Sequence, residues 1–181
     1  MTLEEKYQHL LKAGTDISDA LPVLREYASK VSHVTEFGIR TAVSTTALLA
    51  AQPDTLISYD IGLDLKYLQD LERVKGRTNF QYRQGDTRLI EIEPTDFLFI
   101  DTSHTYTQLS IELARHANKV RKYIGFHDVV GYGYTDEIHT DSVKKGLKPA
   151  IEEFLARERW ENIYEINSGW GFQLLERKPP L

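Results

Sequence analysis

The sequence contains no cysteine among its 181 residues. A disulfide scaffold and a thiolate metal cluster are therefore excluded, and nothing points to an oxidising compartment. Long apolar runs are also missing. The N-terminal segment MTLEEKYQHLLKAG carries charges throughout and lacks the continuous apolar stretch of a signal peptide or a transmembrane helix. We therefore expect a soluble, cytoplasmic protein that has no membrane partner.

Basic residues are outnumbered by acidic ones. The chain has 22 Lys and Arg against 27 Asp and Glu, which gives a net charge of −5. Such a balance provides no basic face of the kind that neutralises the phosphates of a nucleic acid, so a nucleic acid is not an expected partner. The apolar fraction of 41% and the charged fraction of 27% are typical of globular proteins, and the length fits one domain over residues 1–181.

The order of the apolar patterns indicates a sheet built from βαβ units. Apolar residues at helical spacing predict two helices in the first thirty residues. Beyond them, short apolar runs alternate with amphipathic segments, which is typical of parallel strands connected by helices. The expected strands cover Val34–Phe37, Leu56–Tyr59, Phe80–Arg83, Phe97–Ile100 and Tyr123–Phe126. The expected helices cover Ser44–Ala51, Leu65–Val74, Tyr106–Val120 and a segment that starts around Pro149.

The C-terminal tail predicts two strands of a different kind. Trp160–Ile166 and Trp170–Leu175 are separated by only three residues, and so short a gap fits only an antiparallel connection. We expect Trp170 and Phe172 to serve the core or a subunit contact, because large aromatic residues on a terminal strand usually pack. The predicted fold class is α/β: a Rossmann-like, doubly wound sheet that is mostly parallel, ends in an antiparallel strand pair and is preceded by N-terminal helices.

Acidic residues stand at the ends of the first three predicted strands. Glu36 precedes a glycine turn at Gly38, Asp60 ends the second strand, and Asp86 follows the third. In an open parallel sheet, ligands bind where the turns leave the carboxyl ends of the strands. Asp60 is placed to accept hydrogen bonds from ribose hydroxyls, and Asp86 from an adenine amino group. The three acids together favour a nucleoside ligand, although each alone also fits a cap or a turn.

The glycine turn resembles that of class I S-adenosylmethionine-dependent methyltransferases. In that family the first strand is followed by Glu-x-Gly-x-x-x-Gly-x-Ser. Glu36, Gly38 and Ser44 match this pattern in register, whereas Ala42 stands where the second glycine usually lies. The resemblance implies that S-adenosylmethionine binds with its methionine part beside Glu36 and Gly38. The residues that it places around the cofactor are Glu36, Phe37, Gly38, Thr41, Ser44, Asp60, Ile61, Gly85, Asp86 and Asp101.

Two neighbouring predicted strands end in acids with histidines nearby. Asp101 follows the fourth strand, with His104 three residues later, and the fifth strand is followed by His127 and Asp128. Because the carboxyl ends of parallel strands meet at one edge of a sheet, we expect these four side chains to converge beside the cofactor. Carboxylates suit a hard cation such as Mg²⁺, and an added imidazole moves the preference toward Mn²⁺ or another transition metal. A histidine in a helix-entry loop also fits a plain cap.

This region resembles a subgroup of small O-methyltransferases, those akin to macrolide-sugar methyltransferases and cephalosporin-hydroxylase-like proteins. Their pattern is Phe-Ile-Asp-Gly-Asp-His-x-Tyr, followed by a strand that ends in His-Asp. The matching residues here are Phe99, Ile100, Asp101, His104, Tyr106, His127 and Asp128, while Thr102 and Ser103 replace the usual Gly-Asp. The resemblance implies methyl transfer to a small-molecule hydroxyl, with a divalent metal, Mg²⁺ or Mn²⁺, on Asp101, His127 and Asp128 and with His104 as the general base.

The segment from Val129 to Ser142 contains glycines and tyrosines, a composition that suits a mobile substrate lid as well as an ordinary surface loop. This segment, the N-terminal helices or a second subunit of a homo-oligomer must define the acceptor.

Three other functions stay open. A nicotinamide-dependent oxidoreductase is disfavoured because a Gly-x-Gly-x-x-Gly turn is missing. A cofactor-binding module without turnover fits the departures from the motifs, and a metal-dependent hydrolase needs more ligands than the pattern supplies.

Overall fold

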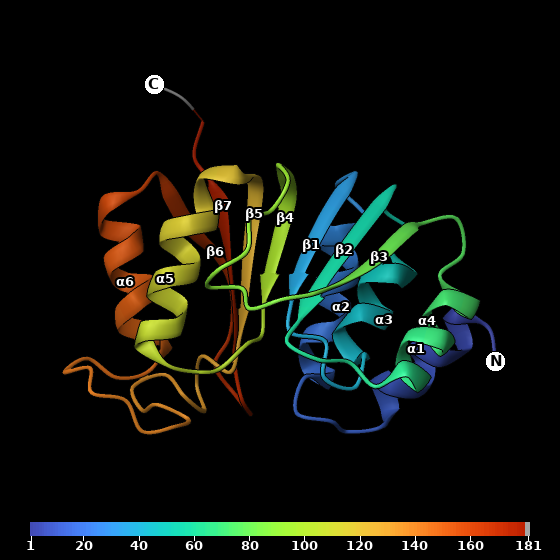
Figure 1. Cartoon of the computed structure of the whole chain (residues 1–181), viewed down its shortest axis with the longest axis horizontal. Helices are drawn as coiled ribbons and strands as arrows, with labels where there is room; N and C mark the ends of the chain where they lie inside the picture. The colour runs from blue at the N-terminus through green and yellow to red at the C-terminus, as the bar shows by residue number, and fades with distance from the viewer. Residues whose placement is uncertain (180–181) are drawn as a thin grey trace.

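A seven-stranded sheet forms the centre of the computed structural model, which describes residues 1–179 (Figure 1). From one edge to the other, the strands lie in the order β3, β2, β1, β4, β5, β7 and β6. The first five strands run parallel, and β7 is antiparallel to both of its neighbours. The predicted fold class is therefore confirmed. The bounds are β1 His33–Phe37, β2 Thr55–Asp60, β3 Asn79–Gln84, β4 Thr95–Ile100, β5 Val120–His127, β6 Trp160–Ile166 and β7 Phe172–Arg177.

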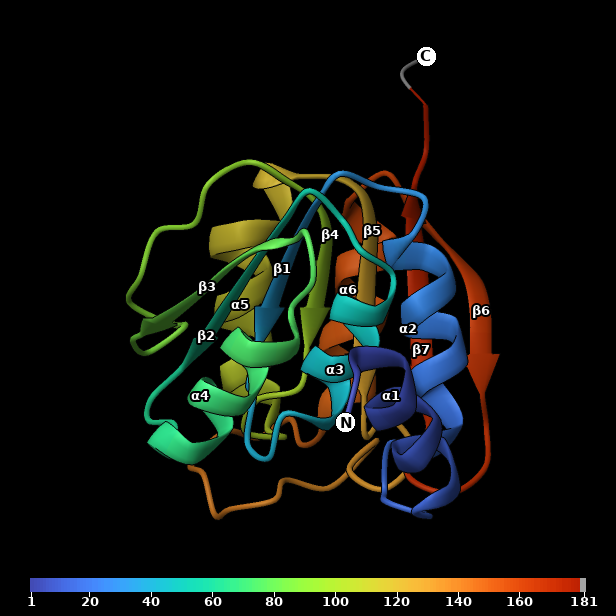
Figure 2. The same cartoon turned by 90° about the vertical axis from the view of Figure 1, so that its right-hand side faces the viewer.

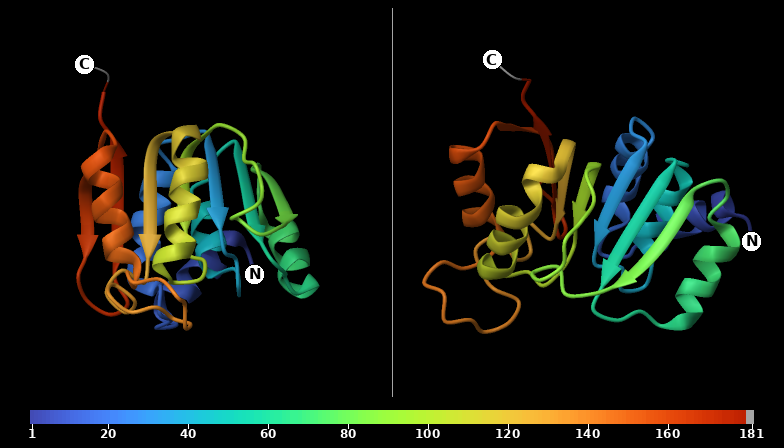
Figure 3. Two further views of the ribbon diagram at one scale, coloured as in Figure 1. Left: turned by 60° about the vertical axis from the view of Figure 1, so that its left-hand side comes forward. Right: turned by 45° about the horizontal axis from the view of Figure 1, so that its top comes forward.

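Helices cover both faces of the sheet (Figure 2, Figure 3). Side chains of β4 alternate between the two apolar clusters: Phe97 and Phe99 join one, Leu98 and Ile100 the other. Within residues 1–179 no helix is long and apolar enough to cross a membrane. The helices that contribute to the first cluster are α1 Leu3–Lys12, α2 Leu21–Ala28, α3 Val43–Ala50 and α4 Leu65–Val74. Those that contribute to the second are α5 Tyr106–His116 and α6 Leu147–Arg157.

The order of the strands reverses between β1 and β4. The chain adds β2 and β3 on one side of β1 and then crosses to the other side, where β4 pairs with β1 and β5 follows. Phe37 at the end of β1 lies in register with Ile100 at the end of β4, so the segments that follow these strands leave the sheet side by side. In sheets of this kind, ligands bind in the crevice at such a reversal.

The predicted boundary between the fifth helix and β5 is wrong. The helix expected to reach Val120 ends at His116, and a 3-10 turn, η2 (Ala117–Lys119), follows it. Val120 instead starts β5, because it pairs with Thr95 of β4. Val120 thus continues the apolar spacing of the preceding helix but belongs to the sheet.

The last strand begins at Phe172 rather than at the predicted Trp170. The backbone carbonyl of Trp170 accepts hydrogen bonds from the backbone N–H groups of Val130 and Gly131, at 2.9 and 3.1 Å, and so does not pair within the sheet. Gly171 then takes a φ of +84° and turns the chain into β7. Phe172 is buried in the core, whereas Trp170 lies beside the loop that follows β5.

Candidate functional site

The turn after β1 brings the backbone close to the end of β4. Gly38, Arg40 and Ala42 all have positive φ, of +87°, +48° and +64°. A Cβ on Gly38 would lie 2.0 Å from the carbonyl oxygen of Asp101, so only glycine lets the turn pack directly on the residue after β4. Ala42 precedes α3 and keeps the left-handed conformation that glycine adopts most easily.

Asp60 holds this turn in place. One carboxylate oxygen accepts hydrogen bonds from the backbone N–H groups of Ile39 and Arg40, at 2.7 and 3.2 Å. The other accepts from the backbone of Gly62 at 3.0 Å. The acid at the end of β2 thus connects the turn after β1 with the turn after β2.

A pocket of about 260 Å³ opens at this edge of the sheet. Six of the residues predicted to surround the cofactor line it: Gly38, Asp60, Ile61, Gly85, Asp86 and Asp101. The other four lie outside the lining, and of these Glu36, Phe37 and Ser44 are buried and Thr41 is exposed. The lining also includes residues that were not among the predicted cofactor contacts, namely Arg40, Tyr59, Thr87, Arg88, Thr102, Ser103 and Gln108.

Glu36 is fully buried behind the turn. Its two carboxylate oxygens accept hydrogen bonds from the hydroxyls of Ser44 on α3 and Ser58 on β2, both at 2.6 Å. Burial disfavours the charged form, and despite these hydrogen bonds it raises the pKa of Glu36 to about 7. Glu36 therefore joins β1, β2 and α3 beneath the pocket.

Replacing Glu36 by Gln is expected to change how stability depends on pH. The pKa of Glu36 is about 7 in the folded protein and 4.5 ordinarily, so between these values the folded state binds a proton that the unfolded chain has lost. Stability contributed by this proton is present below pH 4.5 and is lost as the pH rises through about 7. The loss is on the order of 3 kcal/mol, since one pKa unit corresponds to about 1.4 kcal/mol.

Denaturant unfolding of both proteins at about pH 5 and about pH 8 tests this expectation. The free energy of unfolding of Glu36→Gln should fall less between the two pH values than that of the wild type. Burial also raises the pKa of Glu112 to about 7. Glu112 is present in both proteins, so its contribution cancels when the two falls in unfolding free energy are compared. Equal falls in the two proteins would remove Glu36 as the titrating group.

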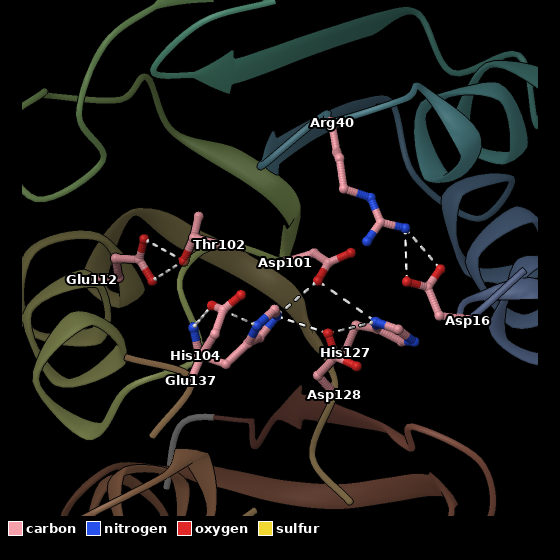
Figure 4. Close-up of polar contacts among 9 residues, drawn as sticks. All are labelled: Asp16, Arg40, Asp101, Thr102, His104, Glu112, His127, Asp128 and Glu137. Carbon is pink, nitrogen blue, oxygen red and sulfur yellow. Dashed lines mark hydrogen bonds and ion pairs between the residues drawn. The ribbon is translucent and has the colours of Figure 1, made fainter. Parts of the chain in front are cut away.

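The four predicted side chains after β4 and β5 do converge (Figure 4). His104 Nε2 lies 2.8 Å from Asp128 Oδ2 and 3.2 Å from Asp101 Oδ1. His127 Nδ1 lies 3.4 and 3.5 Å from the same two oxygens. Asp101, His104 and Asp128 each offer a ligand atom within 4.8 Å of the others, a spacing that suits a metal ion. We call these four residues the Asp–His cluster.

Opposite charges dominate the electrostatics of the Asp–His cluster. Burial disfavours charge on every member, but hydrogen bonds and ion pairs between carboxylates and imidazoles outweigh it. They raise the pKa of His104 to about 10 and that of His127 to about 9, and they lower the pKa of Asp101 and Asp128. The two imidazoliums therefore balance the charges of the two carboxylates, and a cation that binds Asp101 and Asp128 has to displace protons from the imidazoles.

The loop between β5 and α6 adds a residue that the sequence motifs do not mark. Glu137 Oε2 accepts a hydrogen bond from the backbone N–H of His104 and lies 3.1 Å from its Nδ1. Asp136 anchors the same loop by accepting from the backbone of Tyr106 and Gly146, which begin α5 and precede α6. Burial opposes ionisation of Asp136, but these hydrogen bonds lower its pKa to about 2. The loop is thus tied to the cluster and to both helices.

Aromatic rings pack on the imidazole of His104. The ring of Tyr132 stacks on the imidazole with 5.0 Å between centroids and 5° between planes. Trp170 packs against Tyr132 with 5.7 Å between centroids and is 43% exposed. Trp170 therefore packs on the ring that stacks on His104, which is compatible with the packing role predicted for it.

Arg40 lies between the pocket and the N-terminal segment (Figure 4). Its guanidinium contacts both carboxylate oxygens of Asp16, at 2.7 and 2.8 Å. Both side chains are more exposed than those of the cluster, so the ion pair itself adds little stability. It does place a positive charge at the opening, next to the acids of the cluster.

Solved methyltransferases share this fold. An O-methyltransferase from Bacillus cereus in complex with SAH is 18% identical, with a TM-score of 0.68 over 97% of this chain and 90% of that chain. The O-methyltransferase TomG from Streptomyces achromogenes, involved in tomaymycin synthesis and solved with SAM, is 16% identical, with a TM-score of 0.68 over 98% and 89%. The N-methyltransferase NodS from Bradyrhizobium japonicum WM9 is 13% identical, with a TM-score of 0.65 over 94% and 100%.

At such identities the similarity shows the fold alone, which is that of S-adenosylmethionine-dependent methyltransferases. Comparison with protein-family models gave no match, and neither did comparison with curated proteins. Both oxygen and nitrogen methyltransferases occur among the similar structures, so the acceptor atom has to be argued from the site.

Proposed function

We propose that this protein transfers the methyl group of S-adenosylmethionine to a hydroxyl oxygen of a small-molecule acceptor. The observation that carries the proposal is the position of Asp101, which lines the pocket and also belongs to the Asp–His cluster. A cofactor in the pocket and an acceptor at the cluster would therefore be neighbours. The methyltransferase fold of the chain agrees with this arrangement.

The pocket has features that suit S-adenosylmethionine. Gly38 lets the turn after β1 pack on the backbone of Asp101 at the pocket wall, and Asp60 stands at the end of β2, where this kind of sheet holds a ribose. Ile61 is 76% exposed at the same edge and offers an apolar surface for a base. Asp101 lines the pocket and offers a carboxylate that would attract the positively charged sulfonium of the cofactor.

Asp60→Ala is expected to weaken binding of S-adenosylhomocysteine by about 1–3 kcal/mol, the cost of losing hydrogen bonds to a charged group. The variant loses both the acid proposed to hold the ribose and the anchor of the glycine turn. Titration calorimetry measures the affinity. Asp64→Ala is a matched control, because Asp64 caps α4 outside the pocket lining. Unchanged affinity in Asp60→Ala would remove Asp60 from the ribose role.

The Asp–His cluster fits a divalent metal. Asp128 Oδ1 and His127 Nδ1 are buried and have no hydrogen-bond partner within residues 1–179. Unsatisfied buried polar atoms are costly, and a cation would satisfy them. We therefore assign Asp101, Asp128 and His127 as the residues that hold the metal, a set compatible with Mg²⁺ or Mn²⁺ once the His127 imidazole has released its proton. Bound there, the cation would stabilise an ionised acceptor hydroxyl and offset the negative field around His104.

His104 is then the group that accepts the proton of the acceptor. Glu137, Asp101 and Asp128 can only accept hydrogen bonds, so both ring nitrogens carry a hydrogen while the carboxylates face them. A cation held by Asp101 and Asp128 would free Nε2 of its proton, while Glu137 keeps the hydrogen on Nδ1. Stacking on Tyr132 and the hydrogen bond to Glu137 hold the imidazole in one orientation. An alkoxide formed beside Nε2 would attack the methyl group in line, and positioning supplies much of the rate enhancement.

Formation of S-adenosylhomocysteine tests the proposed function. The wild-type protein is incubated with S-adenosylmethionine, Mg²⁺ or Mn²⁺ and a panel of small hydroxyl compounds, and the product is measured by mass spectrometry. We expect acceptor-dependent product that is lost in EDTA. Activity that EDTA does not change would contradict the metal assistance. Cofactor binding without product from any acceptor would favour a binding module.

A further inference from the structure

A buried acid on α5 organises one side of the pocket. Glu112 has no exposed surface, and its carboxylate accepts hydrogen bonds from the hydroxyls of Thr87 and Thr102 and from the side-chain amide of Gln108. These three donors all line the pocket, and they come from the loop after β3, the loop after β4 and α5. Figure 4 shows the pair formed by Glu112 and Thr102. None of these residues belongs to the Asp–His cluster.

The hydrogen bonds fix the orientation of the Gln108 amide. Its Nε2 donates to Glu112 Oε1 at 2.7 Å and to Thr87 Oγ1 at 3.1 Å. The Thr87 hydroxyl donates its own hydrogen to Glu112 and can therefore only accept from Gln108. Both donor hydrogens of the amide are thus engaged, and its carbonyl oxygen, Oε1, makes no hydrogen bond to any residue of the described chain, 1–179. Gln108 consequently presents a hydrogen-bond acceptor at the pocket wall.

The acid expected to bind adenine is already engaged. Both carboxylate oxygens of Asp86 accept from the Arg88 guanidinium, at 2.6 to 3.2 Å, and one also accepts from the Arg88 backbone at 2.9 Å. Asp86 and Arg88 line the pocket next to Thr87. Gln108 Oε1, by contrast, is an uncommitted acceptor on a residue that lines the pocket.

We propose that Gln108, held by Glu112 and Thr87, recognises the exocyclic amino group of the cofactor's adenine. This inference rests on the proposed function and adds a specificity-determining residue to it. The amino group donates a hydrogen to Gln108 Oε1. A base that carries a carbonyl oxygen in place of the amino group has no hydrogen to donate at this position. Its oxygen would face Gln108 Oε1, and neither acceptor would have a donor. Glu112 acts as a positioning residue, because it prevents the amide from rotating to offer its N–H groups instead.

Two ligands that differ at this position provide the test: S-adenosylhomocysteine and its deaminated form, S-inosylhomocysteine. Their affinities for the wild type, Gln108→Leu and Glu112→Leu are measured by titration calorimetry. We expect the wild type to bind the adenosine compound at least about tenfold more tightly, and each variant to reduce this ratio by about tenfold, the change that accompanies one hydrogen bond. A merely structural role would weaken both ligands equally and leave the ratio unchanged.

Two control variants separate the outcomes. Gln8→Leu makes the same substitution on α1, where Gln8 bonds only Glu4, and should keep the wild-type ratio. Asp86→Asn should also keep the wild-type ratio of the two affinities.

A ratio that falls in Asp86→Asn but not in Gln108→Leu would overturn the proposal, as would equal binding of both compounds by the wild type. If the wild type bound neither compound, the proposed function itself would fail. Binding of S-adenosylhomocysteine with an unaltered ratio in both leucine variants would reject only the role of Gln108.

Discussion

Asp128→Asn is expected to lower the rate of methyl transfer about 10³-fold or more, because the loss of several kcal/mol of electrostatic stabilisation corresponds to a factor of that size. Asp128 lies 2.8 Å from His104 and 3.4 Å from His127, so the variant removes one of the two negative charges of the Asp–His cluster. Asparagine is the preferred substitution because it keeps the size of the side chain and adopts the φ of +61° at residue 128 more readily than alanine does.

The rate is measured as formation of S-adenosylhomocysteine, and the affinity for that product by calorimetry. Affinity should stay close to that of the wild type, since Asp128 does not line the pocket proposed for the cofactor. Asp54→Asn is the matched control, because Asp54 is exposed just before β2, at the opposite edge of the sheet. A wild-type rate in Asp128→Asn would refute the catalytic use of the Asp–His cluster.

Gly38→Ala should both destabilise the protein and abolish cofactor binding. The added Cβ would overlap the carbonyl oxygen of Asp101, 2.0 Å away, and that oxygen belongs to the backbone and cannot rotate aside. A φ of +87° adds the cost of a left-handed conformation, about 1–2 kcal/mol. We expect a total loss of more than about 3 kcal/mol of stability, in the range of severe core substitutions.

Gly14→Ala isolates the contribution of the clash. Gly14 has a similar conformation, with a φ of +66°, but an added Cβ there meets no atom within 4 Å. Denaturant unfolding of both variants therefore separates backbone strain from the contact with Asp101. A Gly38→Ala protein no less stable than Gly14→Ala would mean that the turn and the end of β4 move apart easily.

The strand ends could be predicted from the sequence because their signals are local. Phe97 to Ile100 form an uninterrupted apolar run, and the acid that follows it, Asp101, has to lie at the edge of the sheet. Parallel pairing of β4 with β5 then brings Asp101 and Asp128 together without any further assumption. The convergence of the two acids follows from topology alone.

Glu137 could not be predicted in the same way. It contacts His104 from 33 residues away, and the loop that carries it has no regular period. What places it there is Asp136, whose hydrogen bonds to the starts of α5 and α6 fold the loop back on the sheet. Irregular segments of this kind are positioned by tertiary contacts rather than by local pattern.

Glu112 did leave a signal, although the motifs did not use it. It falls on the buried face of α5 together with Leu109, Leu113 and His116. An acid at a core position of an amphipathic helix requires donors, which points to polar neighbours in the loops above. The donors are Thr87 in the loop after β3 and Thr102 in the loop after β4. The sequence pattern does not determine the path of these two loops, so the donors could not be identified in advance.

The reversal of strand order also has a consequence for folding. Asp101 can meet Gly38 only after β1 has paired with β4, a strand some sixty residues later in the chain. Contacts of such separation form slowly, because the chain between them must first lose conformational freedom. Helices α1 to α4 can associate earlier through nearer neighbours, so the pocket should be among the last parts of the molecule to assemble. A nascent chain that has not yet completed β4 would lack a binding site.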